Sequence, residues 1–502
     1  MSLINIQNLT FYYDGSFDDI FHDVSFQIDT DWKLGFIARN GRGKTTFLKL
    51  LTGEYEYKGT ISTNEPFDYF PYNVTDMSKN TVEVLESIHP DYEFWKVCRE
   101  LSLLKVSEDV LFRPFYTLSN GEQTKVCLAL MFSRDNHFLL LDEPTNHLDM
   151  PTRELLREYL RSKKGFLLVS HDRDLLDACV DHVLVINKTN IEVCQGNFSS
   201  WWENKKRQDA YEMSENDRLK KDIHRLKEAA RQASEWADEV ESTKIGKKSF
   251  KYERCLDTRA YVGEKSRRMQ QRRLNLEHRQ QIEIQEKEKL LKNIESTDDL
   301  KLIPLRHYKP VLVKMEDVQI QYDGKKLPKV SFLIENGDRV VLKGKNGCGK
   351  SSIMKLLLAE LNDIEEFTYT GKVETASNLK VSYVSQETRF LKGSLKAFAS
   401  ERNINETLFL TILRKLDFSR LQFEKNMEDY SGGQKKKVLL AASLCEQAHL
   451  YIWDEPLNFI DVFSRMQLEE LICKFQPTML LVEHDKTFVD KIATKVVDYK
   501  EE

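Results

Sequence analysis

The sequence predicts an α/β fold that occurs twice in one chain, with a long pair of helices between the two copies. Three observations predict it. Four short motifs occur in the same order in each half of the 502-residue chain. Short apolar runs, typical of buried parallel strands, precede most of these motifs. Two segments without glycine or proline, residues 197–245 and 264–303, lie between the halves and are expected to be helical.

The motifs keep nearly constant offsets between the halves. The offsets are 306 for Lys44 and Lys350, 312 for Ser119 and Ser431, 312 for Asp142 and Asp454, and 313 for His171 and His484. Four motifs in register over that distance indicate a tandem duplication. A chain of this length has room for about three domains. We therefore expect a first copy over residues 1–200, a helical linker over 201–308 and a second copy over 309–502.

The first motif is a glycine-rich turn between an apolar strand and a helix. Such a turn points backbone N–H groups at an anion, and the helix N-terminus adds a favourable dipole. Lys44 and Lys350 are expected to neutralise the β- and γ-phosphates of a nucleotide, and Thr45 and Ser351 to bind Mg²⁺. The other loop residues expected to bind nucleotide are Asn40, Gly41, Gly43, Thr46, Gly344, Asn346, Gly347, Gly349 and Ser352.

The third and fourth motifs supply acids and histidines at strand ends. Asp142 and Asp454 end apolar strands, where a carboxylate can bind the magnesium of a nucleotide. The glutamate that follows each aspartate can polarise the attacking water as a general base. Each histidine follows a further apolar strand and is expected to contact a γ-phosphate. The predicted catalytic residues are therefore Glu143, Glu455, His171 and His484.

Both copies resemble the ATP-binding-cassette family nearly end to end. This resemblance implies that a signature motif of each copy closes over ATP held by the opposite copy, so that two ATP molecules lie between the copies. The signature residues are Ser119, Gly121, Ser431, Gly432, Gly433 and Gln434. The resemblance also implies adenine-stacking roles for Tyr13 and Tyr322, a water- and magnesium-sensing role for Gln386, and cross-dimer roles for Asp149 and Asp461.

Three positions depart from the family pattern. Ala38 stands where the first loop glycine is usual, Tyr72 takes the place of the first copy's sensing glutamine, and Asn120 replaces a signature glycine. An alanine is tolerated where the backbone φ is negative. A tyrosine, however, cannot coordinate magnesium as an amide oxygen does. We therefore hypothesise that the Lys44 site hydrolyses ATP more slowly than the Lys350 site.

Composition narrows the setting of the protein. The net charge is −5, so any basic surface must be local. The eight cysteines show no paired metal-binding spacing, which favours buried free thiols and a reducing compartment. No secretory signal and no apolar stretch of membrane-spanning length is visible. The sequence therefore predicts a cytoplasmic protein without a membrane segment.

The linker combines a helical seam with a basic tip. In its first segment, seven apolar residues from Leu219 to Val240 recur at intervals of 4 and 3, the pattern of a coiled coil. Between Lys244 and Arg279 twelve Lys and Arg face four acids, with aromatic residues interleaved. The tip, about residues 244–261, is therefore expected to bind a polyanion, and structured RNA in particular. The candidate RNA- and ribosome-binding residues are Lys244, Lys247, Lys248, Phe250, Lys251, Tyr252, Arg254, Arg259, Arg267, Arg268, Arg272 and Arg273.

Two fused cassettes with such a linker resemble the ABC-F proteins of the ribosome. The strings 146–149, 170–172 and 195–199 match that family, and 40–44 and 451–458 look most like its Lsa-type antibiotic-resistance branch. The resemblance implies an ATP-dependent monomer that binds the exit site of the 70S ribosome, next to 23S rRNA and the P-site tRNA. Its linker tip would displace lincosamides, pleuromutilins and streptogramin A. ATP and Mg²⁺ are the implied cofactors.

Three other functions remain open on the sequence. A housekeeping translation factor that relieves stalled ribosomes would have the same architecture. The ATPase pair of a transporter needs no long basic hairpin, which counts against that function. In DNA-repair ATPases the coiled coil usually interrupts one cassette, whereas here the helices join two complete ones, so we expect no DNA partner.

Overall fold

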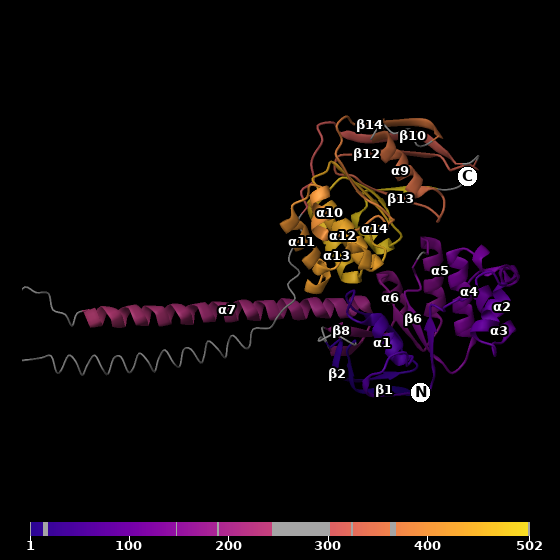
Figure 1. Cartoon of the computed structure of the whole chain (residues 1–502), viewed down its shortest axis with the longest axis horizontal. Coiled ribbons are helices and arrows are strands. Elements are labelled where there is room, and N and C mark those ends of the chain that lie inside the picture. The colour runs from indigo at the N-terminus through magenta and orange to yellow at the C-terminus, as the bar shows by residue number, and fades with distance from the viewer. Residues whose placement is uncertain are drawn as a thin grey trace, which may run out of the picture. The chain divides into compact units, whose positions relative to one another are not determined.

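The computed structural model describes residues 2–13, 19–146, 148–187, 190–242, 302–322, 325–361 and 368–499. Contacts divide the chain into two units. One unit, residues 1–201 and 298–502, contains both copies of the repeated fold, and the other is residues 202–297. No helix in the described ranges is both long enough and apolar enough to cross a membrane. Figure 1 shows the elements by label.

The first copy contains two sheets with helices beside them. Its strands are β1 (Leu3–Phe11), β2 (Phe21–Asp29), β3 (Lys33–Ile37), β4 (Lys58–Ser62), β5 (Phe67–Phe70), β6 (Phe138–Asp142), β7 (Phe166–Val169), β8 (His182–Asn187) and β9 (Asn190–Gln195). Its helices are α1 (Lys44–Leu51), α2 (Thr81–Ile88), α3 (Phe94–Leu103), α4 (Asn120–Ser133), α5 (Met150–Arg161) and α6 (Arg173–Cys179), with 3₁₀ turns Glu108–Phe112 and Phe115–Thr117.

The second copy repeats this order. Its strands are β10 (Val311–Tyr322), β11 (Lys325–Lys326), β12 (Val330–Glu335), β13 (Arg339–Lys343), β14 (Thr368–Thr375), β15 (Val381–Val384), β16 (Leu450–Asp454), β17 (Met479–Val482) and β18 (Lys495–Asp498). Its helices are α9 (Lys350–Leu361), α10 (Leu395–Glu401), α11 (Glu406–Lys415), α12 (Gly432–Cys445), α13 (Val462–Phe475) and α14 (Lys486–Ile492), with 3₁₀ turns Arg420–Glu424 and Met427–Asp429.

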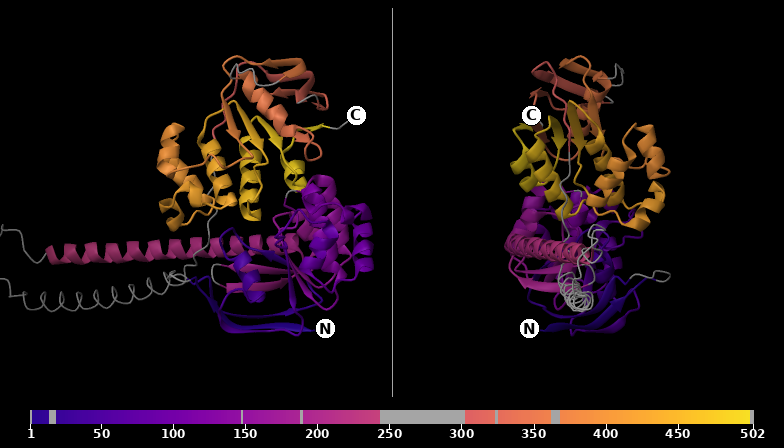
Figure 2. Two further views of the ribbon diagram at one scale, coloured as in Figure 1. Left: turned by 45° about the vertical axis from the view of Figure 1, so that its right-hand side comes forward. Right: turned by 90° about the vertical axis from the view of Figure 1, so that its left-hand side faces the viewer.

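A mainly parallel sheet forms the centre of each copy. Its order is β5-β6-β7-β3-β8-β9 in the first copy, with β9 antiparallel, and β15-β16-β17-β13-β18 in the second. The central strands β7, β16 and β17 are buried on both faces, and alternate residues enter different cores. In β16, Leu450 and Ile452 pack with α9 and the antiparallel β10–β12–β14 sheet, whereas Tyr451 and Trp453 pack with α10 to α14. Figure 2 shows these layers of the second copy from two further sides.

The parallel topology decides where the motifs lie. The carboxyl ends of β3, β6 and β7 meet at one edge of the first sheet, and those of β13, β16 and β17 meet at one edge of the second. The glycine-rich loops, the acidic pairs and the histidines all follow these strands. In open α/β sheets this edge is where ligands bind. The predicted α/β fold with two tandem nucleotide-binding domains is confirmed.

The linker begins with one long helix. Helix α7 covers Phe198–Ser242, 45 residues, which confirms the first helical segment expected from the absence of glycine and proline. At about 1.5 Å per residue such a helix is roughly 68 Å long. The expected return helix, the coiled-coil pairing and the basic tip lie outside the described residues.

A buried ion pair joins the two copies. Arg173, at the start of α6, donates to both carboxylate oxygens of Glu469 in α13, one of them at 3.1 Å. The exposed fraction of the side chain is 5% for Arg173 and 4% for Glu469. Lys491 also contacts the Glu469 carboxylate, at 3.1 Å. A charge so far removed from water depends on its counter-charge.

Replacing Glu469 by Gln is expected to destabilise the protein. The change leaves the Arg173 guanidinium buried without its counter-charge, which costs about 3–5 kcal/mol. Urea unfolding followed by circular dichroism measures the change. The control is Glu93→Gln, because the Glu93 carboxylate is half exposed and pairs with Lys96 at the surface. Equal unfolding midpoints for the two variants would contradict a stabilising role for the Arg173–Glu469 pair.

Candidate active sites

The two glycine-rich loops adopt the same backbone conformation. Gly41 and Gly43 have φ of 80° and 89°, and Gly347 and Gly349 have φ of 79° and 100°. These left-handed values favour glycine. A Cβ atom at Gly43 would also lie 2.6 Å from Cγ2 of Ile20. Each loop leads directly into a helix, so both present a helix N-terminus of the kind that binds phosphate.

The lysine of each loop is held by the loop itself. Lys44 donates from Nζ to the Ala38 carbonyl at 2.9 Å and to Oδ1 of Asn40 at 3.3 Å. Lys350 donates to the Gly344 carbonyl at 2.8 Å. The departure at Ala38 thus preserves the backbone acceptor that glycine supplies in the second copy. Burial lowers the pKa of Lys44, although the nearby carboxylates oppose this shift.

A hydroxyl and a carboxylate lie together in each site, as a magnesium site requires. Thr45 donates to Oδ2 of Asp142 at 3.0 Å, and the Tyr69 hydroxyl donates to the same oxygen at 3.1 Å. In the second copy Ser351 hydrogen-bonds Asp454, whose Oδ1 is buried without a hydrogen-bond partner. Burial raises the pKa of both aspartates. Oxygen ligands of this type suit Mg²⁺, which takes its other ligands from phosphates and water.

The glutamates that follow have a strained backbone. Glu143 and Glu455 have φ of 51° and 46°, in the left-handed region that non-glycine residues rarely occupy. Each peptide N–H is fixed by the neighbouring strand, at 2.9 Å to the Val169 carbonyl and 3.0 Å to the Val482 carbonyl. Strain of this kind, about 1–3 kcal/mol per residue, persists where the surrounding structure imposes it and is common at functional sites.

Each glutamate faces its predicted histidine. Nε2 of His171 lies 3.2 Å from Oε1 of Glu143, and Nε2 of His484 lies 3.6 Å from Oε1 of Glu455. Both histidines are buried. Burial, together with the nearby Lys44 charge, holds the pKa of His171 well below its usual value.

The two glutamates differ in their electrostatic environment. Burial raises the pKa of Glu143 to about 7, and the adjacent Asp142 charge adds to the shift. Burial would also raise the pKa of Glu455, but contacts with His484 and Asn458 outweigh it and lower that pKa. Nδ2 of Asn458 donates to Oε2 of Glu455 at 2.6 Å. The negative charge of this glutamate is therefore better stabilised in the second copy.

The residues at the glutamine position, in the loops after β5 and β15, also differ between the copies. Gln386 donates from Nε2 to Oε2 of Glu455 at 2.8 Å. Its counterpart Tyr72 instead donates to Oδ2 of Asp68 at 2.9 Å. That carboxylate is also paired with Arg134, at 3.0 Å. Tyr72 is thus bound to a side chain outside the motifs and offers no amide to the Lys44 site.

The signature motifs begin two matching helices. Oγ of Ser119 accepts the N–H of Glu122 at 3.3 Å, and Oγ of Ser431 accepts the N–H of Gln434 at 3.3 Å. In both cases the side chain three residues on returns a bond to the serine N–H, which completes a capping box. Asn120 is the first residue of α4, so its replacement of glycine leaves the helix start intact.

Residues of the two copies meet at both loops. Nδ2 of Asn40 donates to the Phe459 carbonyl at 2.8 Å and lies 3.3 Å from the position of a Cβ atom on Gly433. On the other side, the Asn346 N–H donates to the Asp149 carboxylate. Each phosphate loop therefore contacts the segment after the acidic pair of the opposite copy. The signature residue Gly433 lies beside the loop that contains Lys44.

Asp461 is more deeply buried than its counterpart Asp149 and has a charged partner. Asp461 is fully buried, caps α13 through the Ser464 N–H at 2.9 Å, and accepts from Nζ of Lys437 at 2.8 Å. Burial opposes its ionisation, yet the Lys437 charge holds its pKa far below the usual value. Asp149 caps α5 through the Thr152 N–H at 3.2 Å.

Of the two predicted adenine-stacking tyrosines, Tyr13 is described in full. It is 43% exposed, and its ring meets Phe11 and Tyr55 edge to face. Its hydroxyl bonds Oγ1 of Thr46 at 2.7 Å, which connects it to the start of α1. An exposed ring held in this way can stack on a base. The side chain of Tyr322 and the linker residues 244–273 lie outside the described residues.

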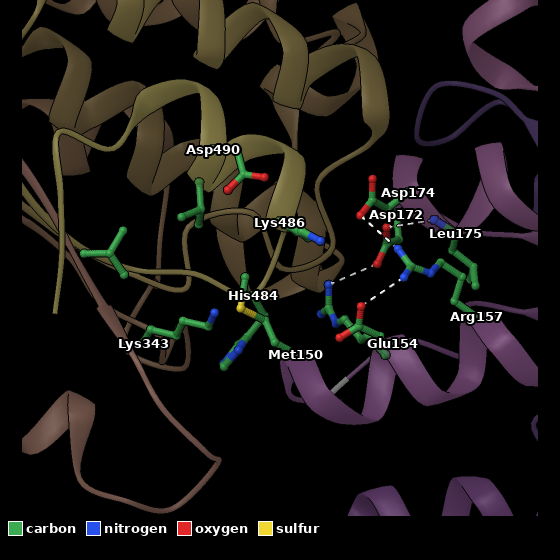
Figure 3. A pocket seen from close by; sticks show the side chains of 13 residues that line it. Met150, Glu154, Arg157, Asp172, Asp174, Leu175, Lys343, His484, Lys486 and Asp490 are labelled. Carbon is green, nitrogen blue, oxygen red and sulfur yellow. Dashed lines mark hydrogen bonds and ion pairs between the residues drawn. The ribbon is translucent and has the colours of Figure 1, made fainter. Parts of the chain in front are cut away.

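A cavity of about 190 Å³ lies between the copies beside the second site. Figure 3 shows His484, Lys343 and Lys486 of the second copy opposite residues of α5 and α6 in the first. Lys486 is the counterpart of Arg173, and Arg157 is the counterpart of Glu469. Two cations thus replace an ion pair, and Arg157 pairs instead with Glu154 at 3.0 Å. Beside Lys44 the copies are joined by the Arg173–Glu469 ion pair, and beside Lys350 a cavity lies between them.

Several residues in these sites were missing from the sequence predictions. They are Tyr69, Arg173, Lys436, Lys437, Glu469 and Glu483. Lys436 and Lys437 are each 2% exposed in a helix that is otherwise mostly apolar. Burial lowers the pKa of Lys436 to about 8. Two charges next to a long apolar run are the sequence signal of their burial.

Two phosphate loops with paired hydroxyls, carboxylates and histidines define a nucleotide hydrolase with two composite sites. The family model described as "ABC transporter" matches residues 21–146 and 327–458, more than half of the chain. The chain therefore belongs to this family of ATP-binding-cassette proteins. It is an ATPase with two tandem cassettes.

Similar proteins narrow the group. The chain is 26% identical to the ATP-binding protein Uup of Buchnera aphidicola, over 99% of this chain and 80% of that protein. It is 26% identical to the ribosome protection protein VmlR of Bacillus subtilis, over 97% and 85%. A putative ATP-binding protein of Bacillus subtilis, YdiF, is also 26% identical, over 96% and 78%. These full-length relatives support assignment to the ABC-F group.

Solved structures support the fold alone. The complex of the archaeal ribosome recycling factor aABCE1 with the stalk protein aP1 matches 99% of this chain and 88% of that chain. The TM-score is 0.63 and the sequence identity 19%. The RNase-L inhibitor matches with a TM-score of 0.62 and 19% identity, again over 99% of this chain and 88% of that one.

Adding a methyl group at Gly433 is expected to disturb the packing of α12 against Phe459, whose carbonyl accepts a hydrogen bond from Asn40 of the first copy. A Cβ atom there lies 2.6 Å from the Phe459 carbonyl oxygen, whereas one at Gly432 lies 3.7 Å from the nearest atom, in ordinary contact. Overpacking of this kind costs about 1–3 kcal/mol. We expect Gly433→Ala to lower the unfolding temperature relative to Gly432→Ala in a thermal shift assay. The reverse order would contradict the close approach.

Proposed function

We propose that this protein is a cytoplasmic ABC-F ATPase that binds the exit site of the 70S ribosome when ATP closes its two cassettes. In this state it protects the ribosome from antibiotics of the peptidyl-transferase centre, namely lincosamides, pleuromutilins and streptogramin A. The observation that carries the proposal is a pair of ATP sites in one chain, with a 45-residue helix after the first copy that is followed in the sequence by a strongly basic segment. A basic segment of this kind suits ribosomal RNA.

The two sites supply a nucleotide-dependent closure. Each phosphate loop contacts the opposite copy through Asn40 or Asn346. ATP bound at a loop would therefore bear on both copies at once. Mg²⁺ at the Thr45–Asp142 and Ser351–Asp454 pairs would shield the phosphate charge. The glutamate accepts a proton from water as its oxygen attacks the γ-phosphorus and ADP leaves, and the copies can then separate.

The linker is the proposed ribosome-binding part. The candidate tip residues 244–261 would meet 23S rRNA near the P-site tRNA, and the protein would act as a monomer whose two cassettes pair within one chain. The relative named ribosome protection protein VmlR supports this function, as does a solved structure titled ribosome-bound archaeal Pelota and ABCE1. We propose that the first cassette covers residues 1–200, the linker 201–308 and the second cassette 309–502.

A second candidate is a translation factor that relieves stalled ribosomes without any drug. It is favoured by the similarity to Uup and YdiF, whose names mention ATP binding and no drug. Drug sensitivity separates the two functions. A gene that restores growth at raised drug concentrations in a sensitive host acts in protection, and one that restores only growth defects of stalled translation acts as a factor.

The Lys350 site is expected to turn over ATP faster than the Lys44 site. Among the residues that the structure describes, only the Lys350 site has a glutamine side chain, Gln386, bonded to its proposed general base. Glu143→Gln leaves the Lys350 site active and Glu455→Gln leaves the Lys44 site active. We expect the residual ATPase rate of Glu143→Gln to exceed that of Glu455→Gln several-fold, measured as phosphate release. Equal residual rates would contradict the asymmetry.

The double variant Glu143→Gln/Glu455→Gln is expected to sediment with ribosomes in the presence of ATP. Trapped ATP holds the copies closed, and binding should weaken at higher salt because phosphate contacts release counterions. Pelleting through sucrose at two salt concentrations measures both effects. A trapped variant that stays in the supernatant at low salt would overturn the proposal. Phe250→Ala and Tyr252→Ala, tested for drug resistance, separate direct displacement from an indirect effect.

A further inference from the structure

The second signature helix contains a buried lysine with an unusual pair of acceptors. Lys436 lies in the first turns of α12, and its side chain is almost fully buried. Nζ donates to the Ser385 carbonyl at 2.9 Å and to the Asp454 carbonyl at 3.0 Å. These carbonyls belong to two different segments, the loop after β15 and the end of β16. One ammonium group thus ties three elements together.

Both acceptors stand next to residues of the Lys350 site. Ser385 precedes Gln386, and Asp454 precedes Glu455. Gln386 and Glu455 are themselves hydrogen-bonded at 2.8 Å. The peptide groups that Lys436 fixes are therefore the ones from which this amide and this carboxylate project. A small displacement of either segment would change the position of the general base relative to the attacking water.

The first copy lacks this device. Thr124 takes the place of Lys436, and Ser170 takes the place of Glu483. Glu483 is buried, accepts the Leu457 N–H at 2.7 Å, and interacts favourably with the Lys436 charge. A buried positive charge and a buried negative charge therefore occur together in the second copy and are absent together from the first. The second copy thus has two buried, oppositely charged side chains at positions where the first copy has two hydroxyl side chains.

We propose that Lys436 is a positioning residue for ATP hydrolysis at the Lys350 site. It also links that site to the Lys44 site, because α12 begins with the signature Ser431-Gly432-Gly433, which lies beside the Lys44 loop at Asn40. Movement of α12 on ATP at Lys44 is transmitted through Lys436 to Gln386 and Glu455. The first copy has no matching link at this position, because Thr124 provides no ammonium. This inference rests on the proposed roles of Glu143 and Glu455.

The test measures each site separately. Lys436→Met is made in the Glu143→Gln background, where the Lys350 site alone turns over, and in the Glu455→Gln background, where the Lys44 site alone does. We expect the first combination to lose at least tenfold in kcat with KM for ATP within twofold. Lys436→Arg, which can donate to both carbonyls, should recover most of the loss. The matched control is Thr124→Val in the Glu143→Gln background, expected to stay within twofold.

Three results would overturn the inference. They are an unchanged kcat for Lys436→Met at the Lys350 site, an equal loss at both sites, and a rise in KM that accounts for the whole loss. Thermal unfolding of each variant shows whether it folds, and Lys436→Arg supplies a folded comparison if the methionine variant does not. Turnover that persists in Glu143→Gln/Glu455→Gln would instead overturn the catalytic glutamates, and this inference with them.

Discussion

Burial of charge at the ends of the parallel strands is the constraint on which the rest of the structure depends. A carboxylate or ammonium removed from water needs a partner, and the buried charges in these sites have partners of different kinds. Asp142 accepts two hydroxyls, Asp461 accepts Lys437, and Arg173 pairs with Glu469 across the copies. The strands fix the positions of these charged groups. Because each group needs a partner, particular loops and helices must lie close to it.

The two copies have the same fold and different chemistry. In the second copy the proposed general base, Glu455, is stabilised by Gln386, Asn458 and His484. In the first copy burial dominates, and the residue at the glutamine position is bound to Asp68. The contact surface between the copies is unequal as well, with an ion pair beside Lys44 and a cavity beside Lys350. The differences around Glu455 and Gln386 support the proposal that the Lys350 site is the faster of the two.

The fold followed from the sequence because its signals are local. Glycines before a lysine, an apolar run before an acid and a serine that caps a helix each specify their own short stretch of backbone. The constant offsets then showed that the stretches belong to two copies of one domain. The predicted linker helix was likewise readable from residues 197–245, where no helix-breaking residue occurs.

The partners of buried charges could not be predicted in this way. Arg173 and Glu469 are 296 positions apart, and nothing near either residue indicates the other. The bonds from Lys436 end on backbone carbonyls, which have no signature in a sequence. Tyr72 was recognised as a departure, but no pattern in the sequence indicated its bond to Asp68.

The left-handed backbone at Glu143 and Glu455 has a consequence for how this protein tolerates change. A glycine at either position would relieve the torsional cost and remove the carboxylate at the same moment. Thermal stability and the proposed catalytic role therefore favour different residues at these two positions. Selection for thermostability alone would therefore be expected to remove the proposed general bases.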